Sequence, residues 1–208
     1  MRKLFLFIVC FILFGVGIKA QRFPQAVLPG DYPDPSILRD GKNYYMTHSP
    51  FYYAPGFLIW HSTDLIHWEP VCRALPEYEG SAMAPDLLKY QGRYYIYYPT
   101  STGENFVIYA DNIRGPWSKP VKLDVKGIDP GHVVGEDGKR YLFTNNGWIT
   151  PLSDDGLKVT GKSRKVYDGW EYPANWVTEG KDMYLESPKL LYKDGYYYMM
   201  SAEGGTAG

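Results

Sequence analysis

The sequence has 208 residues, a formal net charge of −1 and an aromatic content of 17%, with 20 Tyr and 6 Trp. A chain this close to neutrality has no electrostatic basis for binding nucleic acid or an anionic membrane. The aromatic content is too high for a disordered chain and suits β-sheet packing or stacking against sugar rings. Gly and Pro are frequent but dispersed, as expected for many short strands joined by many turns.

The N-terminus has the organisation of a secretory signal peptide. Basic Arg2 and Lys3 precede an apolar run over residues 4–18, which is short for a membrane span of about 20 residues. We therefore expect residues 1–20 to be cleaved on export, leaving no membrane segment. Cleavage leaves Cys72 as the single cysteine, which excludes an intrachain disulfide. An exported protein without disulfides favours the periplasm or the outer surface of a bacterium.

One short motif recurs four times in the rest of the chain. Each copy contains a proline, an apolar strand, a turn that ends in Gly and a Tyr-containing strand. The copies cover residues 33–45, 84–95, 129–141 and 186–198, roughly 50 residues apart. Their hairpin turns are Asp40-Gly41, Gln91-Gly92, Asp137-Gly138 and Asp194-Gly195.

The repeat predicts an all-β fold. Aromatic strands are expected at residues 44–46, 94–98, 141–143 and 196–200, and third strands at residues 57–60 and 106–109. No long segment after the signal has the helical period of 3.6 residues. Four strands per unit at this spacing is typical of a β-propeller, in which the innermost strands of the blades meet at one axis. The fourth unit is cut off at Gly208, so we expect residues 21–208 to be an N-terminal fragment of a propeller domain.

Three acidic residues occupy matching places in the repeat. Asp34 and Asp129 directly precede the motif proline in the first and third units, and Glu186 stands one position earlier in the fourth. A single Asp-Pro is usually a turn dipeptide. Three carboxylates at the entrances of three axial strands are instead expected to converge, and paired carboxylates are the groups that glycoside hydrolysis requires.

The motifs resemble those of glycoside hydrolase family 43 over essentially the whole mature chain. They are P-D-P-S-I at Asp34, A-P-D-L at residues 84–87, G-I-D-P at Asp129, and E-S-P-K-L-L-Y-K-D-G-Y-Y-Y with A-E-G-G-T from Glu186. The resemblance implies a five-bladed propeller, of which this chain covers about three and a half blades. It also implies an inverting mechanism with Asp34 as general base, Glu186 as general acid and Asp129 as the residue that modulates the pKa of the acid.

The segment around T-H-S-P-F-Y-Y-A-P-G-F looks most like β-xylosidases that also act on α-L-arabinofuranosides. Phe51 matches an aromatic wall of their exo-acting pocket. Met83 stands before A-P-D, where those enzymes usually have Trp, so the preferred pentose and linkage stay open. The expected activity is the release of β-D-xylose or α-L-arabinofuranose from hemicellulose-derived oligosaccharides.

The expected partner is an oligosaccharide or polysaccharide substrate, with no nucleic acid and no cofactor. No histidine has metal-ligand spacing, so no metal site is predicted in the chain, although the resemblance leaves room for a structural calcium at the axis of the full-length protein. His132, three residues after Asp129, is expected to reach the axis. Two alternatives stay open, a retaining fructan hydrolase-like enzyme and a non-catalytic sugar-binding propeller. The first is disfavoured because this chain has P-D-P-S, I-D-P and Glu186-Ser187 instead of N-D-P-N, R-D-P and Glu-Cys.

Overall fold

The computed structural model describes residues 26–204, apart from residues 79, 170–172, 174 and 176–184. The predicted signal peptide, residues 1–20, lies outside the described residues. No helix in the described part of the chain is long and apolar enough to cross a membrane.

The first two repeat units each form one antiparallel four-stranded sheet whose strands follow one another in chain order. The first sheet contains β1 (Ser36–Asp40), β2 (Asn43–Thr47), β3 (Gly56–Ser62) and β4 (Glu69–Leu75). The second contains β5 (Asp86–Tyr90), β6 (Arg93–Pro99), β7 (Asn105–Ala110) and β8 (Val121–Leu123).

The third sheet has the same order, and the fourth consists of two strands in the described residues. The third contains β9 (Gly131–Val134), β10 (Arg140–Thr144), the 3₁₀ turn η1 (Asn145–Gly147), β11 (Trp148–Pro151) and β12 (Arg164–Lys165). The fourth contains β13 (Leu185–Lys193) and β14 (Tyr196–Glu203). The predicted hairpins and aromatic strands are confirmed by these pairings.

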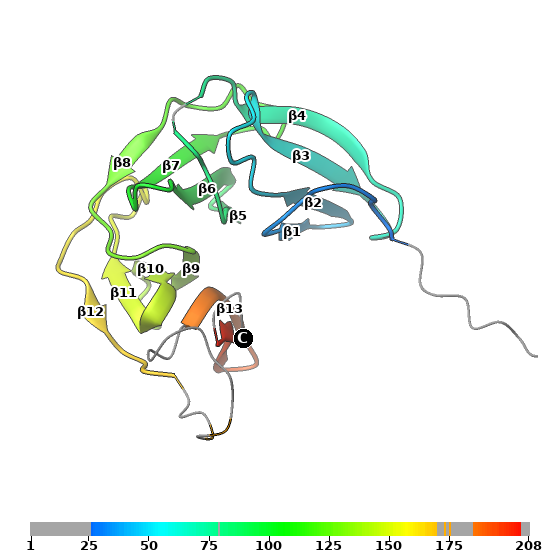
Figure 1. Ribbon diagram of the computed structural model, residues 1–208. Coiled ribbons are helices and arrows are strands. Elements are labelled where there is room, and N and C mark those ends of the chain that lie inside the picture. Colours follow the sequence, from blue (N-terminus) through cyan, green and yellow to red (C-terminus); the bar gives the residue numbers. More distant parts are fainter. Residues whose placement is uncertain (1–25, 79, 170–172, 174, 176–184, 205–208) are drawn as a thin grey trace, which may run out of the picture.

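The sheets are arranged as propeller blades. Figure 1 shows β1, β5, β9 and β13 facing a common centre, with β4, β8 and β12 at the outside. We number the blades 1 to 4 in chain order. The motif proline precedes the innermost strand in blades 1 to 3 and lies within β13 in blade 4.

The tyrosine run of strand β6 does not alternate with polar residues, because both faces of this strand are packed. Tyr94, Ile96 and Tyr98 pack into an apolar cluster shared with blade 1, which includes Phe57 and Ile59. Tyr95 and Tyr97, on the opposite face, pack into a second cluster shared with blade 3. Because successive side chains of a strand point to opposite faces, β6 is buried on both sides. The tyrosines of β6 are therefore packing residues.

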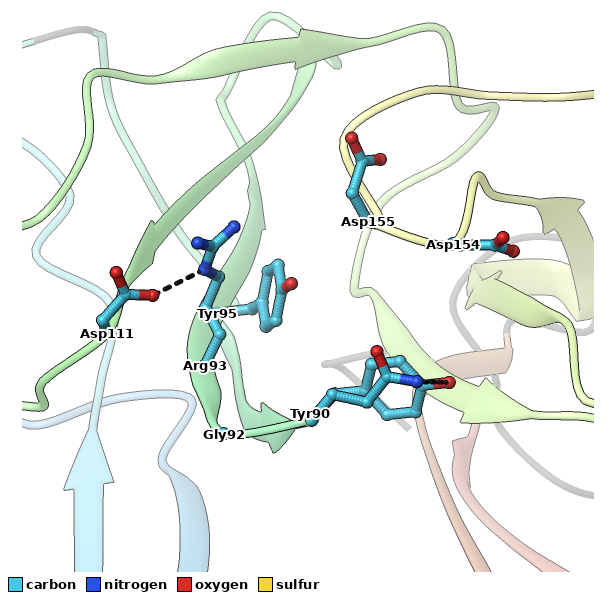
Figure 2. Close-up of a pocket in the computed structure, with 8 residues that line it drawn as sticks. Tyr90, Gly92, Arg93, Tyr95, Asp111, Asp154 and Asp155 are labelled. Carbon is cyan, nitrogen blue, oxygen red and sulfur yellow. Dashed lines mark hydrogen bonds and ion pairs between the residues drawn. The ribbon is translucent and has the colours of Figure 1, made fainter.

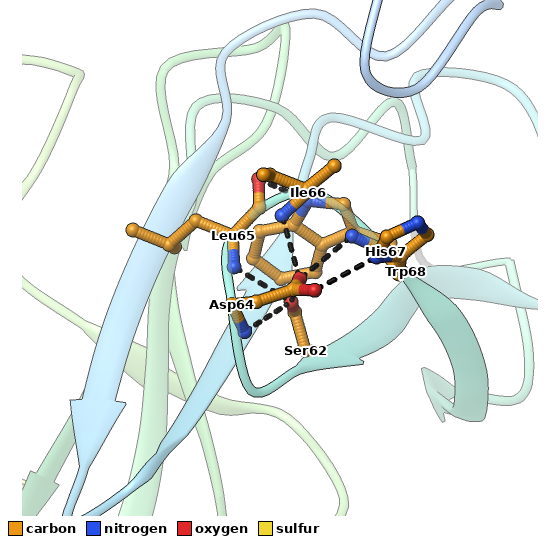
Figure 3. A network of polar contacts seen from close by, with 6 residues as sticks. All are labelled: Ser62, Asp64, Leu65, Ile66, His67 and Trp68. Carbon is orange, nitrogen blue, oxygen red and sulfur yellow. Dashed lines mark hydrogen bonds and ion pairs between the residues drawn. The ribbon is translucent and has the colours of Figure 1, made fainter.

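The β3–β4 connection is a tight polar turn (Figure 3). The Ser62 hydroxyl accepts hydrogen bonds from the backbone N–H groups of Asp64 and Leu65. One carboxylate oxygen of Asp64 accepts from the N–H groups of Ile66 and His67, and the other contacts the His67 ring at 2.7 Å. These bonds hold the pKa of Asp64 well below its usual range, with His67 as the largest cause. His67 is therefore a surface turn residue.

Candidate active site

The residues that precede the four motif prolines share one backbone conformation. Asp34, Ala84, Asp129 and Ser187 have φ angles of 53°, 41°, 57° and 50°. This left-handed region is uncommon for residues other than Gly, and Asp is enriched in it. Ser187 is therefore the structural equivalent of Asp34 and Asp129. Glu186 lies one residue before that position, as the sequence indicated.

Ser49 connects Asp34 to blade 2. Its hydroxyl accepts a hydrogen bond from the Ala84 N–H at 2.6 Å and donates its own proton to Oδ2 of Asp34. Its backbone N–H donates to the carbonyl oxygen of Pro33 at 2.9 Å. Ser49 is 3% exposed, whereas Asp34 is exposed. The serine therefore fixes one carboxylate oxygen of Asp34 and leaves the other for a further partner.

Asp129 is the buried member of the acidic set, with 9% of its surface exposed. Burial is the main cause of the raised pKa of Asp129. A hydrogen bond from the Ser187 N–H at 3.2 Å opposes that rise, and the nearby charge of Asp34 adds to it. Asp34 and Asp129 therefore interact electrostatically, although they belong to blades 1 and 3.

Glu186 is half-buried on β13, close to Asp129 because Ser187 follows it directly. The approach of β13 to β9 depends on Gly131. A Cβ atom at Gly131 would lie 1.8 Å from the carbonyl oxygen of Pro188, far inside van der Waals contact. Glycine at this position therefore lets the Glu186 strand lie against the Asp129 strand.

The turn η1 holds the residues that precede two of the acids. The Asn145 side-chain oxygen accepts a hydrogen bond from the Ile128 N–H at 2.9 Å, and the Asn145 N–H donates to the Ile128 carbonyl oxygen at 2.8 Å. The Asn146 side-chain oxygen accepts from the Leu185 N–H at 3.2 Å. Ile128 precedes Asp129, and Leu185 precedes Glu186. The turn therefore fixes the backbone at both acids.

Lys189 lies where blades 2, 3 and 4 meet. Its ammonium group donates to Oδ1 of Asp86 at 2.9 Å and to the carbonyl oxygens of Pro130 at 3.0 Å and Pro85 at 3.4 Å. The other carboxylate oxygen of Asp86 accepts from the His132 N–H at 2.8 Å. Asp86 therefore combines a hydrogen bond at the start of β5 with an ion pair between blades.

The expectation that His132 reaches the axis is wrong. Its ring stacks on Tyr97 with centroids 5.9 Å apart, and its Nε2 accepts a hydrogen bond from Nε of Arg140 at 2.9 Å. The ring therefore lies at the packed boundary of blades 2 and 3. The sequence spacing placed the backbone of His132 correctly but could not show which face of β9 its side chain occupies.

Phe51 and Met83 come together at the boundary of blades 1 and 2. Phe51 forms an isolated β-bridge with Ala82, the residue before Met83, and the Met83 N–H donates to the Pro99 carbonyl oxygen at 3.0 Å. A cavity of about 320 Å³ adjoins this boundary, and Pro33, Ser49 and Phe51 are among its lining residues. The two predicted wall residues and Asp34 therefore belong to one region of the surface.

A second cavity, of about 430 Å³, lies at the opposite end of the strands (Figure 2). The β5–β6 turn, Asp111 and Asp154-Asp155 line it, and Arg93 pairs with Asp111 at 2.8 Å. It contains none of the predicted site residues. Its polar lining belongs to the rim remote from the motif prolines.

Sequence reasoning missed Ser49, the two asparagines of η1 and Lys189 as residues that hold the acids. In the sequence, Ser49 stands within the T-H-S-P-F segment, and Asn145-Asn146-Gly147 carries the signal of a turn. Among residues that the structure describes, no group of three or more His, Cys, Asp and Glu side chains could hold a metal ion. The axial oxygens around Lys189 already accept from its ammonium group, and Ca²⁺ takes 6–8 oxygen ligands. These oxygens are therefore occupied by Lys189, and a calcium ion at the axis of the full-length protein stays a prediction.

Fold and site together define a class: a β-propeller with carboxylates at the entrances of its innermost strands, a set of groups suited to glycoside hydrolysis. Comparison with known proteins gives the family. The profile described as "Glycosyl hydrolases family 43" matches residues 23–208. The chain belongs to this family, whose related solved structures are five-bladed propellers, and the predicted fold is confirmed.

The relatives are named as xylosidases and arabinosidases. The chain is 34% identical to the "Xylosidase/arabinosidase" of Butyrivibrio fibrisolvens, covering 87% of this chain and 38% of the relative. It is 36% identical to the "Xylan 1,3-beta-xylosidase" of a Vibrio species, covering 86% and 38%. The crystal structure of the xylan beta-1,4-xylosidase from Bacillus halodurans matches with a TM-score of 0.74 and 33% identity, covering 89% and 39%. The chain therefore spans less than half the length of these relatives.

Proposed function

We propose that the full-length protein is an exported, inverting, exo-acting glycoside hydrolase. It releases β-D-xylose, α-L-arabinofuranose or both from hemicellulose-derived oligosaccharides. The observation that carries this proposal is geometric: Asp34 and Asp129 share one left-handed backbone conformation at the entrances of their innermost strands, and the buried Asp129 accepts a hydrogen bond from the N–H of Ser187, the residue after Glu186. Membership of family 43 and the names of the relatives support the substrate class.

Asp34 is proposed as the general base. The Ser49 hydroxyl accepts from the Ala84 N–H, so its own proton points to Oδ2 of Asp34. Oδ1 is then the oxygen that takes a proton from water, while the water oxygen attacks the anomeric carbon. The bond to the leaving oxygen breaks as the new bond forms on the opposite face of the sugar, which inverts the configuration.

Glu186 is proposed as the general acid that protonates the leaving oxygen. An acid in this role must stay protonated until the bond breaks. Asp129, when ionised, favours the protonated form of a neighbouring carboxyl group through like-charge repulsion. The hydrogen bond from the Ser187 N–H holds Asp129 next to the Glu186 backbone. This arrangement supports Asp129 as the modulating residue.

Phe51 and Met83 are proposed as walls of the sugar pocket. Phe51 lines the cavity beside the Asp34 entrance, and the β-bridge to Ala82 brings Met83 to the same boundary. Methionine is softer and more adaptable than an indole ring. The pocket is therefore expected to accept more than one pentose ring shape.

The test is an assay of the full-length protein on aryl β-xylosides and aryl α-L-arabinofuranosides, with the product anomer followed by NMR. Inversion gives α-xylose as the first product of a β-xyloside. Asp34→Asn is expected to abolish hydrolysis of all these substrates, because no other group activates water. Glu186→Gln is expected to slow phenyl glycosides by at least about a hundredfold more than 2,4-dinitrophenyl glycosides, whose leaving group needs no proton.

Asp111→Asn is the matched control, because it removes an exposed carboxylate from the remote cavity and leaves the axial acids intact. It is expected to keep the activity of the unmodified protein. Equal losses on both leaving groups in Glu186→Gln would contradict its role as the acid. A first product of retained configuration would instead favour the retaining alternative, and absence of hydrolysis with intact sugar binding would favour the binding alternative.

A further inference from the structure

Lys189 brings a positive charge into a region built from backbone oxygens and carboxylates. Its ammonium group contacts Asp86 and Pro85 of blade 2 and Pro130 of blade 3, while its own backbone belongs to blade 4. Asp86 is 8% exposed, so its carboxylate lies in surroundings where an unpaired charge is costly. One side chain thus ties three blades together at their innermost strands.

The same ammonium group lies next to the proposed catalytic groups. Pro130, whose carbonyl oxygen it contacts, follows Asp129, and Lys189 itself comes three residues after Glu186. Among the described residues, the charges that act on Asp129 belong to Asp34 before β1 and Lys189 on β13. Asp86 on β5 is paired with Lys189, and Glu186 directly precedes Ser187, whose N–H donates to Asp129. Lys189 is the cation of this set, and its charge opposes the rise in the pKa of Asp129.

We propose that Lys189 is a positioning residue whose ammonium group fixes the acid-bearing strand β13 at the axis and sets the pH range over which the axial carboxylates act. The three hydrogen bonds orient β13 relative to blades 2 and 3, and therefore Glu186 relative to Asp129. The charge stabilises the ionised forms of the carboxyl groups around it. For its kinetic readout the inference rests on the proposed glycosidase function.

The experiment compares pH profiles of kcat/KM on phenyl β-xyloside for the full-length protein and two variants. Lys189→Met keeps an unbranched apolar stem and removes the charge. Both limbs of its pH profile are expected to move to higher pH by about one unit. Loss of a neighbouring positive charge raises the pKa of a carboxyl group by an amount of this order. Asp86→Asn keeps the ammonium group and removes its counter-charge, so both limbs are expected to move to lower pH.

Two further variants separate positioning from folding. Lys189→Arg keeps the charge and is expected to restore the unmodified pH limbs. The double variant Lys189→Met/Asp86→Asn no longer carries an unpaired buried carboxylate, so it provides a folded protein without the ammonium group if Lys189→Met alone does not fold. A purely structural role for Lys189 predicts that the rate falls by the same factor at every pH, and that result would overturn the proposal.

A second measurement does not depend on turnover. The pKa of the Asp129 carboxyl group, followed by carbon-detected NMR titration, is expected to be higher in Lys189→Met than in the unmodified protein. It is likewise expected to be higher in the double variant than in Asp86→Asn, because each of these two comparisons removes the ammonium group alone. An unchanged Asp129 titration would overturn the proposal about Lys189 even in an active enzyme. Absence of hydrolysis by the unmodified protein, together with a raised Asp129 pKa in the variant, would refute the glycosidase function and support the role of Lys189.

Discussion

A buried arginine makes the boundary of blades 2 and 3 sensitive to acid. Arg140 is 1% exposed, and its guanidinium group lies between the rings of Tyr90 and Tyr95, 4.5 Å from each centroid. Its Nε donates to Nε2 of His132, which must be unprotonated to accept. Burial and then the Arg140 charge lower the pKa of His132 to about 4.

The size of the effect follows from this shift. An unfolded histidine titrates near pH 6.5, so between pH 6.5 and 4 the unfolded chain binds a proton that the folded chain does not. The contribution of His132 to stability is therefore present above pH 6.5 and is lost as the pH falls toward 4. The difference of about 2.5 between the two pKa values corresponds to about 3 kcal/mol of unfolding free energy. This is a large share of the roughly 5–15 kcal/mol by which a typical domain is stable against unfolding.

The assay is urea unfolding of the protein and of His132→Gln at several pH values between 7 and 4. Glutamine keeps a side-chain acceptor for Arg140 but does not titrate. The unmodified protein is expected to lose about 3 kcal/mol more than the variant across this range. Because other titrating groups are common to both proteins, the difference isolates His132. Equal pH dependence in the two proteins would refute the reasoning.

Two further substitutions test how the acids are held. Ser49→Ala removes the hydroxyl bridge between Asp34 and blade 2 and is expected to reduce kcat/KM by about tenfold to a hundredfold. Ser62→Ala is its control, because it removes the buried hydroxyl of the β3–β4 turn. This control is expected to lower the melting temperature without changing kcat/KM. Gly131→Ala is expected to destabilise the fold by about 3 kcal/mol or more in denaturant unfolding, because the added methyl group meets a backbone carbonyl oxygen. Gly161→Ala is its control, since a methyl group there meets only a proline side-chain carbon at 3.0 Å. Unchanged activity in Ser49→Ala, or equal stability of the two glycine variants, would contradict these roles.

The repeat predicted the blades because its signals are local. The Asp-Gly and Gln-Gly turns and the strand alternation are set within about ten residues, so the hairpins and the equivalence of Asp34 and Asp129 could be read directly. Strand β11 was not singled out, since it is short and follows a 3₁₀ turn. The holding contacts could not be predicted because they join residues that are distant in the chain, such as Lys189 and Asp86. The face of β9 taken by His132 depends in the same way on a distant residue, Tyr97 of blade 2, on which its ring stacks.

The direction of the hydrogen bonds at the axis has a consequence for biosynthesis. The Ser49 bridge to Asp34 is completed by a backbone N–H of blade 2, and Asp86 receives its donors from blades 3 and 4. Asp129 receives its donor from blade 4. Each of these three carboxylates is therefore held by donors from a blade that is synthesised after its own. The acids acquire their final surroundings in chain order. Until blade 2 has packed against blade 1, the Ser49 hydroxyl that donates to Asp34 lacks the Ala84 N–H that donates to it.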